Sequence, residues 1–170
     1  MILYQIKYQS PIGELLIAAD ENNLLLLKFL RTDKIENFIN SKFSNYKIYR
    51  KKNEILDKTT SQLSEYFSGK RTEFNIPLNF IYGTKFQVDV WKKLRSIKFG
   101  ETASYLDIAR LINNPFSYRA VGNANNKNPI SIIIPCHRVL ANDGKIGGYG
   151  GGINSKQFLL DIEKKYPLGK

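Results

Sequence analysis

The chain contains one cysteine and one histidine, and they are neighbours, Cys136 and His137. A thiol is nucleophilic as the thiolate, and an imidazole close by can accept its proton, directly or through a water molecule. Side chains adjacent in sequence often point apart, so we expect a bridging water rather than direct contact. The alternative is a buried structural cysteine, which is the commoner role of a lone cysteine. The pair therefore predicts a nucleophilic site, with a structural thiol as the competing interpretation.

A base of this kind needs a group that orients its ring. Glu163, in the helical pattern "SKQFLLDIEKKY", can accept a proton from the far ring nitrogen, and its alternative is a solvent-facing helix position. The apolar run "ISIII" predicts a buried strand or extended segment that ends at Pro135, because proline has no N–H for regular pairing. The loop "GKIGGYGGG" follows the thiol and supplies free backbone N–H groups, but it matches neither common phosphate-binding motif.

Composition limits the classes of protein. Lysine and arginine number 26 against 15 acidic residues, a net charge of +11, and residues 84–170 hold most of the excess. This favours a polyanionic partner such as nucleic acid, with a solvated lysine-rich surface as the alternative. One cysteine excludes an intrachain disulfide and a zinc site of several thiolates. No apolar run can span a bilayer and no signal-peptide pattern is present, so we expect a cytoplasmic protein without membrane contact.

The first part of the chain, residues 1–83, is predicted to be a supporting α+β domain. The segments "MILYQIKY", "ELLIAAD" and "LLLLKFL" predict a three-strand meander, and "YKIYRK" a further strand. The pattern "DKIENFINSKF" predicts one helix, and "NEILDKTTSQLSEYFSGK" a second one with a cap at Asn53 and a stop at Gly69. No catalytic constellation is evident in this part.

The second part, residues 84–170, is predicted to be mostly helical. A helix begins at a Thr84 cap and runs to a stop at Gly100. Two shorter helices, "TASYLDIARLI" and "YRAVGNANN", flank the turn "NNPFS". In a basic protein this arrangement indicates a helix-turn-helix, although helical hairpins commonly serve packing alone. Arg119, near the start of the second helix, is a candidate to enter a DNA groove, with an ordinary surface arginine as the alternative.

Several of these segments together resemble one family. The segment "PCHRV", preceded by "NP" and followed by "GYGGG", is similar to the active-site segment of the O6-alkylguanine-DNA alkyltransferases, also called methylated-DNA–protein-cysteine methyltransferases. "FQVDVW", "GETASY", "RAVGNAN" and "FLLDIE" match in the same order, over residues 84–165. The first half resembles the family more loosely. The resemblance implies an α+β fold, with an N-terminal ribonuclease-H-like domain and a C-terminal winged helix-turn-helix-like domain.

The resemblance also implies roles for residues near the thiol. Cys136 accepts the alkyl group, His137 is the water-linked base, and Glu163 orients His137. Asn128 supports the turn that presents the thiol. Tyr105 donates a hydrogen bond to N3 of guanine as the alkyl group departs.

Further implied roles concern the contact with DNA. Arg119 takes the place of the flipped nucleotide in the base stack, and Asn114 and Asn142 contact the DNA backbone. Tyr149 forms a wall of the pocket. Some relatives have serine where this chain has Gly150, whose N–H can still approach O6 of guanine, and the smaller residue leaves space for bulkier alkyl groups.

The implied function is DNA repair by direct reversal. The protein flips O6-alkylguanine out of double-stranded DNA, reads its amino group with the carbonyls of Cys136 and Val139, and takes the alkyl group irreversibly onto Cys136. O4-alkylthymine is a further candidate substrate. We expect a monomer that needs no cofactor and no metal. The alternatives are a protein that binds alkylated DNA without chemistry and a cysteine hydrolase, whose Cys and His are normally distant in sequence.

Overall fold

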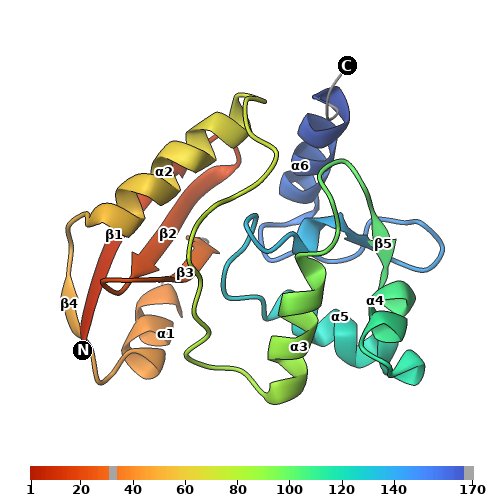
Figure 1. Ribbon diagram of the computed structural model, residues 1–170, viewed down its shortest axis with the longest axis horizontal. Coiled ribbons are helices and arrows are strands. Elements are labelled where there is room, and N and C mark those ends of the chain that lie inside the picture. The colour runs from red at the N-terminus through yellow and green to blue at the C-terminus, as the bar shows by residue number, and fades with distance from the viewer. Residues whose placement is uncertain (31–33, 167–170) are drawn as a thin grey trace. The chain divides into compact units, whose positions relative to one another are not determined.

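The computed structural model describes residues 1–30 and 34–166, which fall into two compact units, Met1–Tyr82 and Gly83–Lys170 (Figure 1). The sequence predicts a boundary between residues 83 and 84, one position later. Within the described residues, no helix has both the length and the apolar character needed to cross a membrane.

The first unit is built on a four-stranded sheet with the order β3-β2-β1-β4. Strands β1 (Ile2–Ser10), β2 (Gly13–Ala19) and β3 (Leu24–Phe29) form the predicted antiparallel meander. Strand β4 (Lys47–Tyr49) pairs with β1 in parallel. The side chains of β2 are buried on both faces of the sheet from its third residue on, so both faces are covered.

Two helices complete this unit, α1 (Lys34–Lys42) and α2 (Glu54–Phe67). The predicted Asn53 cap is present, because its side chain accepts a hydrogen bond from the Leu56 amide at 3.0 Å. Gly69 has a positive φ of 73°, which suits its predicted role as a helix stop. One core cluster joins α1 to the sheet and contains Leu3, Leu16, Ala18, Leu25, Leu26, Ile39 and Phe43.

The second unit is mainly helical (Figure 1). Its elements are α3 (Lys85–Leu94), β5 (Ala103–Ser104), α4 (Tyr105–Leu111), the 3-10 turn η1 (Pro115–Ser117), α5 (Tyr118–Asn126), the 3-10 turn η2 (Cys136–Arg138), β6 (Val139–Leu140) and α6 (Ile153–Lys165). Strands β5 and β6 pair in parallel. Helices α4 and α5 pack against each other across η1, as a helix-turn-helix requires.

Helix α3 begins as predicted and ends earlier than predicted. Thr84 and Gln87 form a reciprocal capping box at its start. The helix ends at Leu94 rather than near Gly100, because Ser96 and Ile97 donate to carbonyls only three residues earlier and tighten the last turn.

Trp91 fixes α3 against α5. Its side chain is fully buried, and Nε1 donates to the carbonyl of Ala124 at 2.8 Å. Gly83 lies against the indole ring, and a Cβ atom at this position would be 2.7 Å from it. Gly83 also has a φ of +115°, so both the close approach and the backbone require glycine.

The predicted strand before the thiol is absent. Residues Ile130–Ile134 instead form a tight turn with one bridge, between Ser131 and Ile134. The side chain of Asn128 closes this turn, since Oδ1 accepts from the Ile130 amide at 3.0 Å and Nδ2 donates to the Ile134 carbonyl at 2.9 Å. Ile132 has a φ of +72°, a rare conformation for a β-branched residue. The apolar run predicted burial correctly and the strand wrongly, because burial alone does not define the backbone.

We expect Trp91→Phe to lower the melting temperature. The substitution removes the indole donor and part of the buried volume, which together cost about 1–4 kcal/mol. Thermal unfolding followed by circular dichroism measures the change. The control is Lys85→Ala, which removes an exposed ion pair with Asp89 and should change stability by less than about 0.5 kcal/mol. A Trp91→Phe protein that melts with the wild type would contradict this account of how α3 and α5 are joined.

Candidate active site

Cys136 is the first residue of η2 and its side chain is only 3% exposed. Its amide donates to the Ile134 carbonyl at 2.7 Å, and its carbonyl accepts from Nδ2 of Asn125 at 3.2 Å. Pro135 precedes it and restricts the backbone. The thiol is therefore presented by a turn that is held on both sides, rather than by the end of a strand.

His137 and Glu163 are in direct contact. The imidazole is completely buried, and its Nε2 lies 2.7 Å from Oε1 of Glu163, which α6 contributes. Glu163 is 1% exposed, so the alternative of a solvent-facing residue is wrong. The structure thus brings together the two residues that the sequence analysis paired.

Glu163 also accepts hydrogen bonds that the sequence analysis missed. Arg138 donates from Nε to Oε2 at 2.9 Å and from Nη2 to Oε1 at 3.0 Å, and the Gly100 amide donates to Oε2 at 3.0 Å. The third guanidinium nitrogen of Arg138, Nη1, donates to the Ile97 carbonyl at 2.6 Å. A buried carboxylate is tolerated only when donors compensate for its lost hydration, and here three residues do so.

These contacts set the charges of the site. Burial alone would raise the pKa of Glu163, but the hydrogen bonds from His137 and Arg138 and the positive charge of Arg138 outweigh it and lower that pKa to about 2. Burial lowers the pKa of His137, and the charges of Arg138 and Lys156 add to this, whereas Glu163 opposes it. At neutral pH the pair is therefore an ionised carboxylate and a neutral imidazole.

The neutral imidazole has a defined tautomer. Because the ionised Glu163 can only accept, Nε2 of His137 carries the proton and Nδ1 carries the lone pair. Nδ1 is buried and has no hydrogen-bond partner among the described residues. It is thus a proton acceptor inside the protein, which is what a general base requires.

Lys156 is a second residue that the sequence analysis missed. It is fully buried in α6, and Nζ donates to the Val139 carbonyl at 2.6 Å. Burial lowers its pKa, and the negative charge of a Cys136 thiolate acts in the opposite direction. The interaction is mutual, so the ammonium group also favours the thiolate. The signal in the sequence is the position of Lys156, two helical turns before Glu163 and on the same face of α6.

The two carbonyls that the resemblance assigns to the guanine amino group each have a donor already. Asn125 donates to the carbonyl of Cys136, and Lys156 donates to that of Val139. The Cys136 carbonyl also accepts from the Val139 amide. A carbonyl oxygen has two lone pairs, so both on Cys136 are already engaged, whereas Lys156 engages one of the two on Val139.

Tyr105 stands at the start of α4 and packs beside the glycine-rich loop. A Cβ atom on Gly147 would lie 2.9 Å from the Tyr105 hydroxyl oxygen, and one on Gly122 would lie 3.8 Å from its ring. Burial, and secondarily the charge of a Cys136 thiolate, raise the pKa of Tyr105. Its hydroxyl is therefore protonated at neutral pH and can donate a hydrogen bond.

Tyr149 and Gly150 are neighbours in the glycine-rich loop, but their surroundings differ. The ring of Tyr149 meets that of His137 edge to face, with centroids 6.4 Å apart. Gly150 is exposed, and a Cβ atom there would meet no heavy atom within 4 Å. The tyrosine is thus a neighbour of the buried base, and the glycine borders open space.

Arg119, Asn114 and Asn142 are exposed and lie outside this buried cluster. The guanidinium carbon of Arg119, in the first turn of α5, is 5.7 Å from the centroid of the Tyr118 ring. Asn114 immediately precedes η1, and its carbonyl accepts from the Ser117 hydroxyl at 2.6 Å. The side-chain oxygen of Asn142 accepts from an amide at the start of α4 at 3.3 Å. All three belong to the helix-turn-helix or to the segment beside it.

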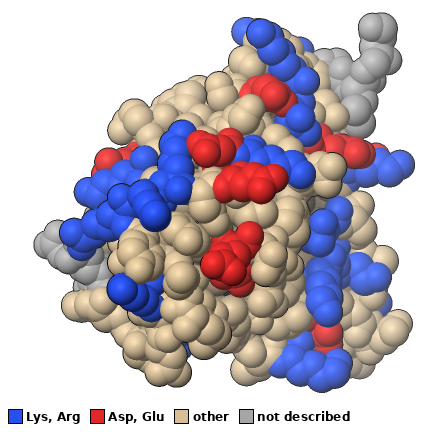
Figure 2. Space-filling model, turned by 60° about the vertical axis from the view of Figure 1, so that its left-hand side comes forward, with Lys and Arg blue, Asp and Glu red and all other residues tan. Residues whose placement is uncertain are grey.

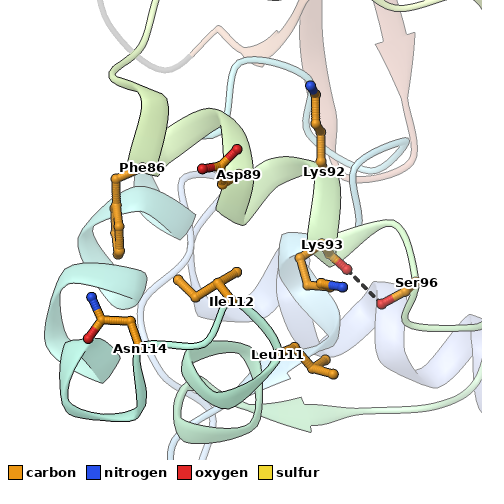
Figure 3. A pocket seen from close by; sticks show the side chains of 8 residues that line it. All are labelled: Phe86, Asp89, Lys92, Lys93, Ser96, Leu111, Ile112 and Asn114. Atoms are coloured by element: carbon orange, nitrogen blue, oxygen red, sulfur yellow. Dashed lines mark hydrogen bonds between the residues drawn. The ribbon is translucent and has the colours of Figure 1, made fainter.

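A separate shallow pocket of about 410 Å³ lies between α3 and the end of α4 (Figure 3). Of the predicted site residues it contains only Asn114, and the hydroxyl of Ser96 is occupied by a 2.8 Å bond to the Lys93 carbonyl. The pocket holds none of the reactive groups described above. Its lining consists of Phe86, Asp89, Lys92, Lys93, Ser96, Leu111, Ile112 and Asn114.

Comparisons with known proteins identify one family for both units of the chain. Residues 3–80 match the family described as 6-O-methylguanine DNA methyltransferase, ribonuclease-like domain, and residues 85–165 match its DNA binding domain. A methylated-DNA–protein-cysteine methyltransferase of Methanosarcina barkeri is 46% identical over 156 residues, covering 92% of this chain and 94% of the relative. One from Haemophilus influenzae is 42% identical over 165 residues, covering 95% and 87%.

Solved structures give the same result. The crystal structure of the Mycobacterium tuberculosis O6-methylguanine methyltransferase has a TM-score of 0.85 and 39% identity, covering 99% of this chain and 97% of that one. The same protein in complex with DNA has a TM-score of 0.83 and 40% identity, covering 96% and 94%. The chain therefore belongs to the 6-O-methylguanine DNA methyltransferase family.

Proposed function

We propose that this protein repairs DNA by moving the alkyl group of O6-alkylguanine onto Sγ of Cys136. One observation carries the proposal: on a buried turn the single thiol directly precedes a neutral imidazole, which an ionised Glu163 holds with its lone pair on Nδ1. The names of the relatives, and a neighbour solved in complex with DNA, support the same reaction.

The chemistry balances without a cofactor. Nδ1 of His137 takes the thiol proton through a water molecule, and the thiolate displaces guanine from the alkyl carbon. The S–C bond forms as the C–O bond breaks, and the electron pair stays on the guanine. Tyr105 donates a hydrogen bond to N3, which stabilises that leaving charge, and the imidazolium passes the thiol proton through water to the departing guanine. The thioether has no easy leaving route, so each molecule repairs one lesion.

The proposed steps use no metal, because the thiol, the imidazole and the tyrosine hydroxyl account for every bond and proton that moves.

Access to the lesion requires that the nucleotide be rotated out of the duplex. Arg119 fills the space left in the base stack, and Asn114 and Asn142 bind the DNA backbone. Tyr149 bounds the pocket for the rotated base. The open space at Gly150 admits alkyl groups larger than methyl, and its N–H approaches O6.

The partner is a DNA duplex that carries O6-alkylguanine. Residues 84–170 have 14 basic and 6 acidic side chains. On the face drawn in Figure 2 the basic side chains form several groups with acidic ones between them. We propose that the protein acts as a monomer and works in the cytoplasm, where reducing conditions keep its single thiol free.

Incubation with a duplex containing one O6-methylguanine tests the function. Intact-protein mass should rise by one methylene group per molecule, and peptide mapping should place it on Cys136. Cys136→Ser should bind the duplex and transfer nothing, because an alcohol ionises far less readily than a thiol. A serine variant that still removes methyl groups would show that Cys136 is not the acceptor, and binding without transfer by the wild type would favour a DNA-binding protein without chemistry.

Glu163→Gln should slow transfer and reduce stability. The folded pKa of Glu163 is about 2 against an ordinary value of 4.5, so its contribution is present above pH 4.5 and is lost as pH falls toward 2. At neutral pH it amounts to roughly 3 kcal/mol. The lowered pKa of His137 acts in the same direction below pH 6.5.

Urea unfolding at pH 7, 5 and 3 measures this effect. The unfolding free energy of Glu163→Gln should be lower at pH 7 and should fall less between pH 5 and pH 3 than that of the wild type. Glu101→Gln, at an exposed glutamate of the same unit, is the matched control. Parallel pH profiles for wild type and Glu163→Gln would rule out a strongly lowered pKa at Glu163.

Arg119→Ala should slow repair of duplex DNA much more than reaction with free O6-benzylguanine. The free base needs no rotation out of a stack, so only the duplex reaction loses the substitute for the extruded nucleotide. Single-turnover rates on both substrates provide the comparison. Equal slowing on the two substrates would instead show that Arg119 acts in the pocket or stabilises the fold.

A further inference from the structure

A phenylalanine protrudes from the turn between α4 and α5. Phe116 is 93% exposed, more than any other large hydrophobic side chain of the described residues. A single exposed apolar residue is common and by itself indicates nothing. Two further features indicate a role for Phe116: the rigid backbone that carries it and the exposed residues beside it.

The turn that carries the ring is firmly built. The Asn114 amide donates to the Ala109 carbonyl at 2.9 Å. The Asn114 carbonyl in turn accepts from the Ser117 amide at 3.0 Å and from its hydroxyl at 2.6 Å. Pro115 restricts the backbone before the ring. Phe116 is therefore presented on a fixed backbone, and its ordering on binding costs little entropy.

Phe116 continues the exposed face of α5. The turn η1 leads directly into α5, and residues three to four positions apart share one face of a helix. The opposite face is buried through Val121, Ala124 and Asn125. The exposed stripe combines an aromatic ring, a guanidinium and two amides, and consists of Phe116, Arg119, Asn123 and Asn126.

The charge around this stripe favours a polyanion. No acidic residue occurs between Asp107 and Asp143, whereas Arg110, Arg119 and Lys127 in this interval are exposed. Cations bind phosphates, amides bind base edges, and aromatic rings stack on bases or wedge between base steps. The combination matches a nucleic acid and offers no acidic group that would repel it.

We propose that Phe116 is a second DNA-inserting side chain, which stacks on the base step beside the rotated nucleotide while Arg119 fills the vacated position. The inference rests on the proposed function, because only a duplex with an extruded base offers this step. It adds a neutral, aromatic contact to a surface otherwise described by its charges and amides.

The test compares Phe116→Ala and Phe116→Trp with the wild type on a duplex containing O6-methylguanine beside the fluorescent base 2-aminopurine. Phe116→Ala should bind the duplex about 10-fold more weakly, the change expected for one lost base–aromatic stack. It should also reduce the fluorescence rise that reports unstacking. Phe116→Trp should retain both the duplex affinity and the fluorescence rise of the wild type. The matched control is Phe158→Ala, at a partly exposed phenylalanine of α6, which should bind as the wild type does.

Two further readouts separate stacking from other roles. The slope of log affinity against log salt should be the same for Phe116→Ala and the wild type, because no phosphate contact is lost. The loss on duplex DNA should exceed any loss of rate with free O6-benzylguanine, which reports the pocket and the fold.

Unchanged duplex affinity in Phe116→Ala, or a changed salt slope, would overturn the inference. So would sedimentation data in which the ring is needed for contact with a second copy of the chain while DNA affinity is unaffected. A wild type that transfers no benzyl group to Cys136 would instead overturn the proposed function. The reaction with free O6-benzylguanine therefore distinguishes a failure of the Phe116 inference from a failure of the proposed function.

Discussion

The buried carboxylate of Glu163 is the interaction on which the DNA-binding unit depends. It joins α6 to η2 through His137 and Arg138, and to the loop after α3 through the Gly100 amide. A buried charge is strongly destabilising when a partner is missing. Helix α6 therefore packs correctly only when every donor to Glu163 is in place. The contacts that folding requires are thus the same contacts that orient the imidazole of His137.

This constraint explains how a single thiol is made reactive. The carboxylate fixes the imidazole tautomer, and the buried ammonium of Lys156 favours negative charge at Cys136. Tyr105 remains protonated beside the same thiol and is available as a donor. Nucleophile, base and donor thus come from η2 and from the start of α4, all held by neighbouring backbone.

Much of this could be predicted from the sequence, because the informative signals are local. The Cys136–His137 neighbours, the Thr84 cap and the two short helices about "NNPFS" are patterns of types and spacing. The family resemblance supplied the roles of the exposed residues, and their roles stay predictions. Glu163 is predictable because a base needs an acceptor that orients its ring.

The rest depends on tertiary context. Lys156 and Arg138 are charged residues, which sequence patterns place at the surface, and here both are buried by partners distant in sequence. The turn at Ile130–Ile134 results from the Asn128 side chain and includes a positive φ at Ile132 that no propensity favours. Helix α3 likewise ends early because its last turn is tightened by hydrogen bonds between residues three apart, which the apolar spacing does not show.

The tautomer of His137 is the central claim, and one measurement tests it directly. The chain has a single histidine, so ¹⁵N-histidine labelling yields one pair of ring signals. At pH 7 the account predicts a protonated Nε2, an unprotonated Nδ1, and a titration midpoint below the ordinary value of 6.5. An imidazolium at pH 7, or a neutral ring with its proton on Nδ1, would contradict the account, because neither form could accept the proton of Cys136.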